Sequence, residues 1–426
     1  MYKEEIRDFI LKLLNIVTDI DNFEEKMNLC ASWEQYFLYS GYPEIILYLS
    51  QVEEDLINRK FDVALRHYIG QFKKNIQVSQ PYLKNKTGML YGYCGIGLML
   101  LELRKNGMKV EKLLNSVNEI VYSIIIKKIQ RAEKSLENYD ISYEDYDCIE
   151  GLASSLRYLV EFKESDKFNM LINKVLKYLV NLTKCNKYDY PNYYVKPGRL
   201  DELRKRRNPN GIIDYGMAHG LAGILSSLAI VKINGFEVIG MEEAISTLLQ
   251  ELKSSMKNIN GINYWPSILS IDDYLNNKFN DYNLDDYGWC YGVTGVARAM
   301  YLGGQALNDP TYIELAIDTF KQVSINLERV NMSTYIICHG YSGVLVILNE
   351  MYEDTKVEAI KEAADVIVNK ILEWLQSSKV LEDLNKTESR GESSIDLWEG
   401  IIGIALALIN YNNKSKDVIA KLMLVR

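Results

Sequence analysis

The hydrophobic positions of this chain form two kinds of segment that alternate along its length. One kind is apolar on almost every side and follows a glycine, as in HGLAGILSSLAI from His219. The other has apolar residues only at helical spacing, as in MEEAISTLLQELKSSM from Met241 and KVEAIKEAADVIVNKILEWL from Lys356. A helix that is apolar all round is buried on all sides, whereas an amphipathic helix borders solvent. The pattern therefore predicts buried helices that alternate with outer helices.

The buried segments form a repeat of seven copies. Each copy opens with a glycine, and successive lead glycines are 48 to 72 residues apart. An interval of this length holds the buried helix, a return helix and two loops. The lead glycines are Gly41, Gly92, Gly151, Gly220, Gly292, Gly340 and Gly400.

A second glycine follows three residues after the first in five copies, and Glu44 and Ser154 replace it in the other two. Glycine inside a helix costs roughly 1 kcal/mol relative to alanine. At a helix start it permits positive φ in the turn or a close approach of two backbones. The glycines alone also suit an α-solenoid or a helical bundle. The alternation favours an all-α, double-layered α/α toroid in which the glycine turns meet around one mouth.

Composition changes this picture at only a few points. With 426 residues the chain should form two domains or one large closed architecture. A net charge of −8 and a pI near 5.3 argue against nucleic-acid binding. The N-terminal MYKEEIRDFILKLL is typical of an amphipathic helix, not of a signal peptide, and no apolar stretch is long enough to cross a bilayer. We therefore expect a cytoplasmic protein whose six cysteines are reduced thiols or metal ligands.

Metal-binding side chains stand directly before two of the lead glycines. Cys290 lies two residues before Gly292, and Cys338 and His339 immediately precede Gly340. Two thiolates and one imidazole form a known catalytic zinc shell that leaves the fourth tetrahedral position open. A structural zinc site more often has a fourth protein ligand and short CxxC loops, and the sequence has neither. Because the repeat should bring the three side chains together, we expect one Zn²⁺ per chain there.

A second group of candidates suits proton transfer. His219 holds the same repeat position as His339, and no cysteine precedes it to build another metal site. Asp147 lies shortly before Gly151. The third histidine, His67, lies outside the pattern and is expected to be a packing or surface residue. The remaining cysteines are expected to be small apolar core residues, and they are Cys30, Cys94, Cys148 and Cys185.

Paired carboxylates offer an alternative chemistry at the same mouth. Glu150 and Glu399 directly precede their lead glycines. A glycosidase built on an α/α toroid would need two such groups. This alternative leaves the Cys290, Cys338 and His339 set unexplained.

Four motifs, taken together, resemble those of the lanthionine synthetase C-like cyclases, the stand-alone enzymes of lantibiotic biosynthesis of the nisin type. They are YDCIEGL (146–152), GMAHG (216–220), WCYG (289–292) and CHG (338–340). The resemblance implies one toroid domain over residues 1–426, with seven inner and seven outer helices. It also implies one catalytic zinc held by Cys290, Cys338 and His339, with His219 and Asp147 as acid/base residues and Tyr291 as a helper.

The reaction implied by the resemblance is the addition of a cysteine thiol to dehydroalanine or dehydrobutyrine in a ribosomal precursor peptide, which gives a (methyl)lanthionine thioether ring. A free thiol has a pKa of about 8.5, and coordination to zinc deprotonates it. His219 would protonate Cα, while Asp147 orients the imidazole or accepts the thiol proton. The implied partners are the dehydrated precursor peptide, a separate dehydratase and an export transporter, with a peripheral complex at the membrane left open. The alternative is a zinc-containing relative that binds a thiol or glutathione without closing rings.

The resemblance further implies a small non-helical insertion, which we place at residues 187–213. This segment contains three of the seven prolines and the basic cluster Arg204 to Arg207. The cluster is expected either to contact the leader region of the precursor or to be a solvated loop. Some relatives carry an arginine shortly before WCYG, whereas this chain has Asp285, Asp286 and Tyr287 there.

Overall fold

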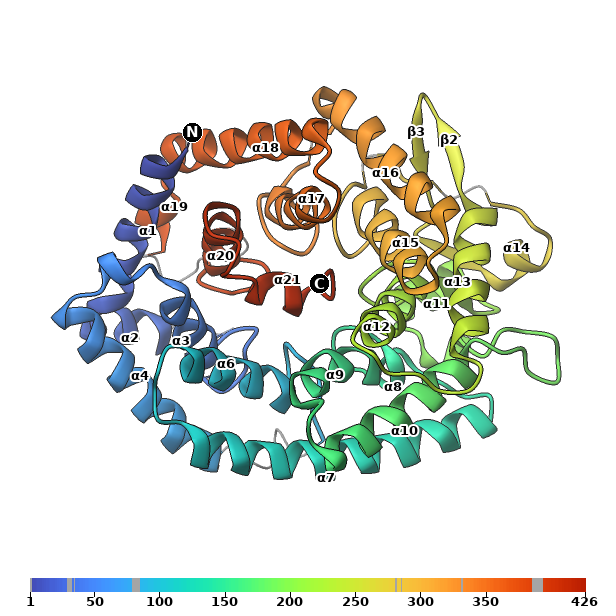
Figure 1. The fold of residues 1–426 in the computed structure, drawn as a ribbon, viewed down its shortest axis with the longest axis horizontal. Helices are drawn as coiled ribbons and strands as arrows, with labels where there is room; N and C mark the ends of the chain where they lie inside the picture. The colour runs from blue at the N-terminus through green and yellow to red at the C-terminus, as the bar shows by residue number, and fades with distance from the viewer. Residues whose placement is uncertain are drawn as a thin grey trace.

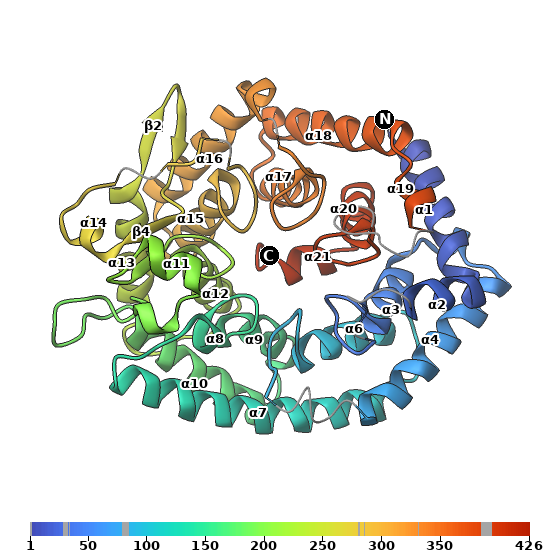
Figure 2. The ribbon, with the colours of Figure 1, turned by 180° about the vertical axis from the view of Figure 1, so that it is seen from behind.

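The computed structural model of the chain describes residues 2–28, 33, 35–78, 85–279, 282–284, 286–330, 332–384 and 394–426. Its helices form two concentric rings, which Figures 1 and 2 show from opposite faces. The predicted double-layered α/α toroid is confirmed. Within the described residues the inner ring consists of α3 (Tyr42–Gln51), α6 (Tyr93–Lys105), α9 (Leu152–Leu159), α12 (Leu221–Ile233), α15 (Val293–Leu307), α17 (Tyr341–Thr355) and α20 (Ile401–Asn412). The outer ring consists of α1 (Lys3–Thr18), α4 (Arg59–Val78), α7 (Glu111–Glu137), α10 (Asp166–Leu182), α13 (Met241–Ser255), α16 (Pro310–Ile325) and α18 (Glu358–Ser377).

The hydrophobic pattern explains which helix lies in which ring. In α12 every residue from Leu221 to Val231 is buried, because other helices pack on all sides of it. In α13 the buried residues return every three or four positions, from Met241 through Ala244 and Ile245 to Leu252, and polar residues occupy the outer face. An apolar stripe of this kind stabilises the outer helices, because the stripe is buried against the rest of the protein while the polar face remains in water.

The ring closes between the two ends of the chain. The chain begins in the outer ring with α1, the amphipathic helix predicted from the N-terminal sequence. It ends its circuit with the inner helix α20, which packs against both α1 and α3, while α1 also contacts α18. The seventh inner helix is therefore paired with the first outer helix, and the double layer is continuous.

The paired glycines are explained mainly by backbone packing at the start of each inner helix. A methyl group added at Gly343 would lie 2.0 Å from the carbonyl oxygen of Ile337. The same clash with the carbonyl six residues earlier recurs at every second glycine of the repeat, Gly95, Gly223, Gly295, Gly343 and Gly403. Among the lead glycines, Gly292 has a φ of +128°, well inside the region that favours glycine.

The two copies without a second glycine have other means of holding the turn. The Glu44 carboxylate Oε1 accepts the Gly41 backbone N–H at 2.9 Å, so this side chain caps the turn that leads into α3. The Ser154 hydroxyl donates to the Gly151 carbonyl at 2.9 Å. Both substitutions therefore preserve the geometry of the turn.

Backbone hydrogen bonds join neighbouring turns into a collar around one mouth. The Tyr39 N–H donates to the Leu90 carbonyl, and comparable bonds link six of the seven neighbouring pairs of turns. The seventh pair is joined by the Thr87 hydroxyl, which donates to the Glu150 carbonyl at 3.2 Å. The other backbone bonds are Cys148 to Ala218, Met217 to Cys290, Cys290 to Cys338, Cys338 to Trp398 and Leu397 to Tyr39, with the donor named first. The expected arrangement of all seven turns at one end of the inner ring is thus confirmed.

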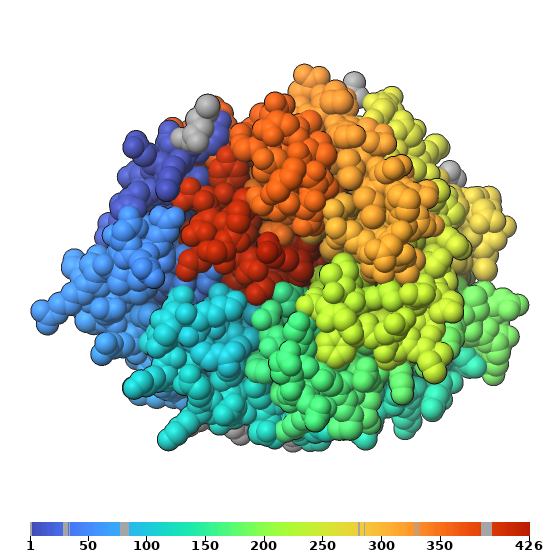
Figure 3. Space-filling model, viewed as in Figure 1, coloured from blue at the N-terminus to red at the C-terminus, as the bar shows by residue number. Residues whose placement is uncertain are grey.

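The C-terminal segment fills the centre of the ring. After α20 the chain turns into α21 (Val418–Leu422), and the space-filling view shows this segment occupying the middle of one face (Figure 3). Side chains from three inner helices bind its backbone carbonyls. Arg157 donates to the Arg426 carbonyl and Arg298 to the Val425 carbonyl, each at 2.8 Å, and Ser226 donates to the Leu424 carbonyl.

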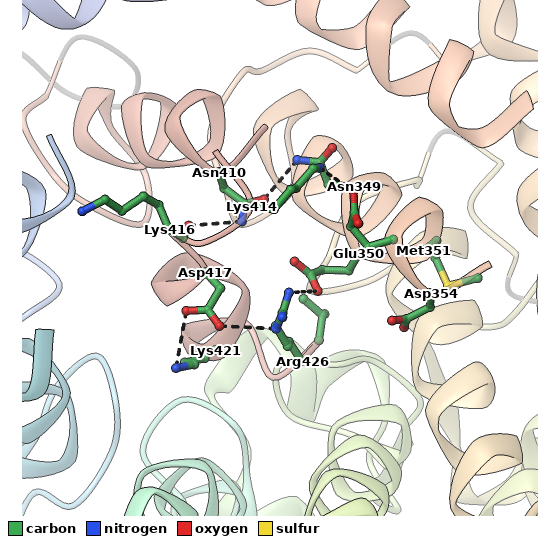
Figure 4. A network of polar contacts seen from close by, with 12 residues as sticks. Asn349, Glu350, Met351, Asp354, Asn410, Lys414, Lys416, Asp417, Lys421 and Arg426 are labelled. Carbon is green, nitrogen blue, oxygen red and sulfur yellow. Dashed lines mark hydrogen bonds and ion pairs between the residues drawn. The ribbon is translucent and has the colours of Figure 1, made fainter. Parts of the chain in front are cut away.

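Ion pairs also hold the C-terminal segment in place (Figure 4). The Arg426 guanidinium lies 3.2 Å from the Glu350 carboxylate on α17 and 3.3 Å from Asp417, which also faces Lys421 at 3.4 Å. The buried indole of Trp289 donates to the Met423 carbonyl at 2.7 Å. Trp289 directly precedes Cys290, so the chain terminus supports the turn that carries this cysteine.

The predicted insertion, residues 187–213, leaves the outer ring after α10. Most of it is irregular, but it includes the short helix α11 (Glu202–Arg207) and leads into strand β1 (Ile212–Asp214). β1 pairs antiparallel with β4 (Ile268–Ser270), and a separate hairpin joins β2 (Lys257–Ile259) to β3 (Ile262–Tyr264). The segment between α13 and α15, which contains β2, β3 and β4, was not predicted from the sequence.

The remaining short helices connect the two layers. They are α2 (Ile20–Asn28), α8 (Tyr143–Tyr146), α14 (Ile271–Leu275) and α19 (Val380–Asp383). None of the helices in the described part of the chain is long and apolar enough to span a bilayer.

Candidate active site

The collar determines which side chains meet at the mouth. The Cys290 N–H donates to the Cys338 carbonyl at 3.0 Å, and the Cys290 carbonyl accepts the Met217 N–H at 2.9 Å. The turn before α15 therefore lies between the turn before α17 and the turn before α12. Each of these three turns carries one or two of the residues predicted for the site.

The three predicted metal ligands come together. One donor atom each from Cys290, Cys338 and His339 lies within 4.8 Å of the other two. Metal bonds of about 2.0–2.3 Å hold tetrahedral ligand atoms roughly 3.5–4 Å apart, so a small adjustment lets all three contact one ion. Cys290 is buried and His339 is exposed, which leaves one side of the cluster open to the mouth. The cluster is thus able to bind a metal.

The predicted acid/base residues form a pair. His219 Nδ1 lies 2.6 Å from Asp147 Oδ2. The Asp147 side chain is only 3% exposed and that of His219 28%, so the imidazole faces the cavity while the carboxylate lies behind it. Burial lowers the pKa of His219, but the hydrogen bond and negative charge of Asp147 outweigh burial and raise this pKa above its ordinary value. The geometry leaves Nε2 as the ring atom that can exchange a proton with a bound molecule.

A second buried carboxylate, Asp214, lies beside this pair. Tyr291 donates its hydroxyl to Asp214 Oδ2 at 2.7 Å, and Tyr143 donates to the same oxygen at 3.4 Å. Burial raises the pKa of Asp214, although His219 and the Tyr291 hydroxyl oppose the shift. Burial and the charge of Asp214 also raise the pKa of Tyr291, so its hydroxyl stays protonated and bound to Asp214.

The metal-binding cluster and His219 line one cavity of about 750 Å³. Its size falls within the range of about 300–1,000 Å³ typical of ligand sites. On the side away from His219, Tyr39 donates to the Glu399 carboxylate at 2.9 Å and stacks on Tyr91 with ring centroids 4.7 Å apart. The residues that line the cavity include Arg204, His219, Asp286, Cys290, Tyr291, Cys338, His339, Trp398 and Glu399.

The two carboxylates of the glycosidase alternative do not face each other across this cavity. Glu399 lines it, but Glu150 lies 2.6 Å from the Lys86 ammonium and lines a separate cavity of about 220 Å³. Asp286, which occupies the region where some relatives have arginine, lines the main cavity, and burial raises its pKa to about 6. Its neighbour Asp285 lies outside the described residues.

The other histidine and cysteines are placed as follows. His67 lies on the outer helix α4, 2.8 Å from the Glu24 carboxylate, in a structural contact. Cys94 and Cys148 are buried core residues as expected. Cys185 is exposed, so its prediction as a core residue is wrong, because the chain is already leaving α10 for the surface insertion. Cys30 lies outside the described residues.

Comparison with known proteins shows the family to which the chain belongs. The family model for lanthionine synthetase C-like proteins matches residues 32–424. This chain belongs to the lanthionine synthetase C-like family. A curated relative of the chain is the nisin biosynthesis protein NisC of Lactococcus lactis subsp. lactis, with 28% identity over 384 residues, which cover 88% of this chain and 85% of the relative.

A solved structure has the same fold as this lanthionine synthetase C-like chain. Nisin cyclase superposes with a TM-score of 0.81 at 24% sequence identity, over 96% of each chain. The match extends around the entire toroid and supports the inner and outer rings described above.

The motifs of the family did not identify every residue that borders the site in this member. Asp214 lies six residues before Gly220, and Asp286 lies six residues before Gly292. Aligning the repeat further upstream of the glycines would have found this shared position. Arg204, which lines the cavity, and Tyr143, which contacts His219, gave no such signal, since neither lies in a glycine turn.

Proposed function

We propose that this protein is a zinc-dependent lanthionine synthetase. It adds cysteine thiols to dehydroalanine or dehydrobutyrine residues of a ribosomal precursor peptide and so forms (methyl)lanthionine rings in lantibiotic biosynthesis. The observation that carries the proposal is that a Cys₂His cluster lines the same cavity as His219, whose imidazole is paired with Asp147. Membership of the lanthionine synthetase C-like family supports the same reaction.

Cys290, Cys338 and His339 suit zinc, because thiolate and imidazole are its preferred ligands and a set of three protein ligands is typical of catalytic sites. A bound zinc ion would lower the pKa of a coordinated peptide thiol and so supply the nucleophile at neutral pH. The cluster opens toward the mouth on the side of the exposed His339, where a peptide can enter.

His219 is the proposed proton donor for Cα. When the peptide sulfur bonds to Cβ of the dehydro residue, the electrons of the C=C bond move toward the adjacent carbonyl, and Cα then needs a proton. His219 Nε2 is free for this step because Nδ1 is bound to Asp147. Asp147 is a positioning residue in this proposal, since its second oxygen already accepts the backbone N–H groups of Ile149, Glu150 and Gly151.

Tyr291 has a supporting role in the proposal. It borders the cavity next to Cys290, and its hydroxyl holds Asp214 beside His219. The proposal also includes a cytoplasmic location, a separate dehydratase that supplies the dehydrated peptide and a transporter that exports the product.

A dehydrated precursor peptide tests the function directly. Ring closure moves a hydrogen from sulfur to carbon, so the expected result is loss of free thiol with no change in peptide mass. Tandem mass spectra should then lack fragments from within each ring. Binding of the peptide or of glutathione without loss of thiol would contradict the proposal and favour the thiol-binding alternative.

A further inference from the structure

Arg204 is separated by the fold from the rest of its basic cluster. It lies on α11, whose first backbone N–H groups are capped by the Asp201 carboxylate. Its side chain is only 35% exposed and borders the main cavity, whereas Lys205, Arg206 and Arg207 are exposed. The insertion thus brings one guanidinium to the mouth and leaves three positive charges outside it.

Arg204 differs in the sign of its charge from the carboxylates that line the cavity. Among the described lining residues it is the sole lysine or arginine, while Asp286 and Glu399 contribute carboxylates. The one ion pair found for it is with Asp201 of its own helix, at 3.4 Å. This exposed contact between neighbours on one short helix adds little stability. Arg204 also makes a cation–π contact with the ring of Tyr143, and both contacts leave it at the edge of the cavity.

Arg204 and the proposed proton donor both contact the ring of Tyr143. The Arg204 guanidinium carbon is 5.8 Å from the centroid of the Tyr143 ring, and that ring is 5.2 Å from the imidazole ring of His219. One aromatic ring thus separates the cation from the acid. Tyr143 is held in place by its bond to Asp214.

The ring-closing reaction needs a positive group at this place. As sulfur bonds to Cβ, negative charge develops on the carbonyl oxygen of the dehydro residue. Bond lengths of about 1.5 Å and 1.2 Å put that oxygen roughly 2.4 Å from Cα. A group that stabilises the oxygen must therefore lie close to the acid that protonates Cα. A guanidinium offers several N–H donors and stays charged at any working pH.

We propose that Arg204 binds the carbonyl oxygen of the dehydro residue and stabilises the enolate formed during addition. This inference rests on the cyclase function proposed above and adds a catalytic residue to it. In the full step the S–H proton passes to solvent, the S–Cβ bond forms, the C=C electrons become the enolate, and protonated His219 gives a proton to Cα and is then reprotonated by solvent. Nothing is oxidised or reduced, and the hydrogen count of the peptide is unchanged.

The test compares Arg204→Gln with Arg66→Gln, an exposed position on the outer helix α4 that lies outside the cavity. At saturating dehydrated peptide, Arg204→Gln should lower kcat roughly 100- to 1,000-fold, the usual effect of losing one oxyanion donor. Zinc content and peptide Kd should remain near those of the unmodified protein. Arg66→Gln should leave kcat unchanged, and Arg204→Lys should recover part of the loss because it restores the charge without the planar fork.

One further measurement separates stabilisation of the enolate from binding of an acidic side chain of the peptide. The kcat effect should persist with a precursor peptide whose Asp and Glu residues are all amides, and its disappearance there would show that Arg204 binds an acidic side chain instead. Unchanged kcat in Arg204→Gln, in a preparation whose unmodified protein closes rings, would overturn this inference alone. Failure of the unmodified protein to close rings would overturn the proposed function and this inference with it.

Discussion

His219 and Asp147 are 72 residues apart in the sequence, yet His219 Nδ1 and Asp147 Oδ2 are 2.6 Å apart at the mouth of the toroid. The other oxygen of the same carboxylate accepts three backbone N–H groups in the turn before α9. The imidazole is therefore oriented by a side chain that is itself fixed by the backbone. This arrangement distinguishes the two residues by role and leads to separate predictions for each.

Replacing His219 with asparagine should remove proton transfer and leave the metal cluster intact. The asparagine amide cannot exchange a proton near neutral pH, so cyclisation should slow by roughly 100- to 10,000-fold, the range typical of losing a general acid or base. Zinc content and peptide binding should be retained, as checked by metal analysis and titration of the same preparation. Loss of zinc together with activity would place His219 in the metal site instead.

The Asp147→Asn variant should change the pH dependence of the reaction. His219 must be protonated to act as the acid, so activity is present below its pKa and is lost as the pH rises through it. Asp147 raises that pKa, and its removal should move the alkaline limb of the kcat profile to lower pH. An alkaline limb that stays in place would show that another group controls it.

The metal content of the protein tests the proposed ligand set. We expect about one zinc per chain, retained after dialysis, and loss of most of it in Cys290→Ala, Cys338→Ala or His339→Ala, because two protein ligands hold an ion poorly. Cys94→Ala is the matched control, since this cysteine is buried in the core and lies outside the cluster. Full zinc occupancy in both ligand-cysteine variants would contradict the assignment.

The exposed part of the basic cluster should act in peptide binding and not in catalysis. Replacing Lys205, Arg206 and Arg207 together with glutamine should weaken binding of a leader-containing peptide roughly 3- to 30-fold at low salt, since exposed ion pairs contribute about 0.2–1 kcal/mol each. The salt dependence of Kd should decrease as well. Unchanged affinity at low salt would identify these three residues as a solvated surface.

A glycine in the first turn of α17 should be intolerant of even one methyl group. The added carbon in Gly343→Ala would meet the Ile337 carbonyl at 2.0 Å, next to Cys338, so unfolding should become easier by at least about 1–3 kcal/mol. Gly70→Ala, in the outer helix α4 with open space around it, should instead stabilise by up to about 1 kcal/mol. Chemical denaturation of both variants checks the contrast, and equal stabilities would show that the turn can move aside.

The repeating architecture and the metal-binding cluster could be predicted from the order of residues alone. Glycines at the start of all-apolar helices report a local requirement for close backbone packing, and this requirement is visible at Gly343 without knowledge of its neighbours. Cys290, Cys338 and His339 could be grouped because equivalent repeat positions are brought to the same level of a closed ring. Periodicity and repeat position are properties of a few residues at a time, so they can be read along the chain.

Contacts between distant segments that do not follow the repeat could be identified only in the folded chain. Arg204 reaches the mouth because the insertion folds back over it, and Tyr143 lies between Arg204 and His219 through packing that no local pattern encodes. Trp289 is held by the Met423 carbonyl, 134 residues away, because the chain terminus enters the centre of the ring. Contacts of this kind depend on the three-dimensional path of irregular segments, which have no periodic signal to predict them.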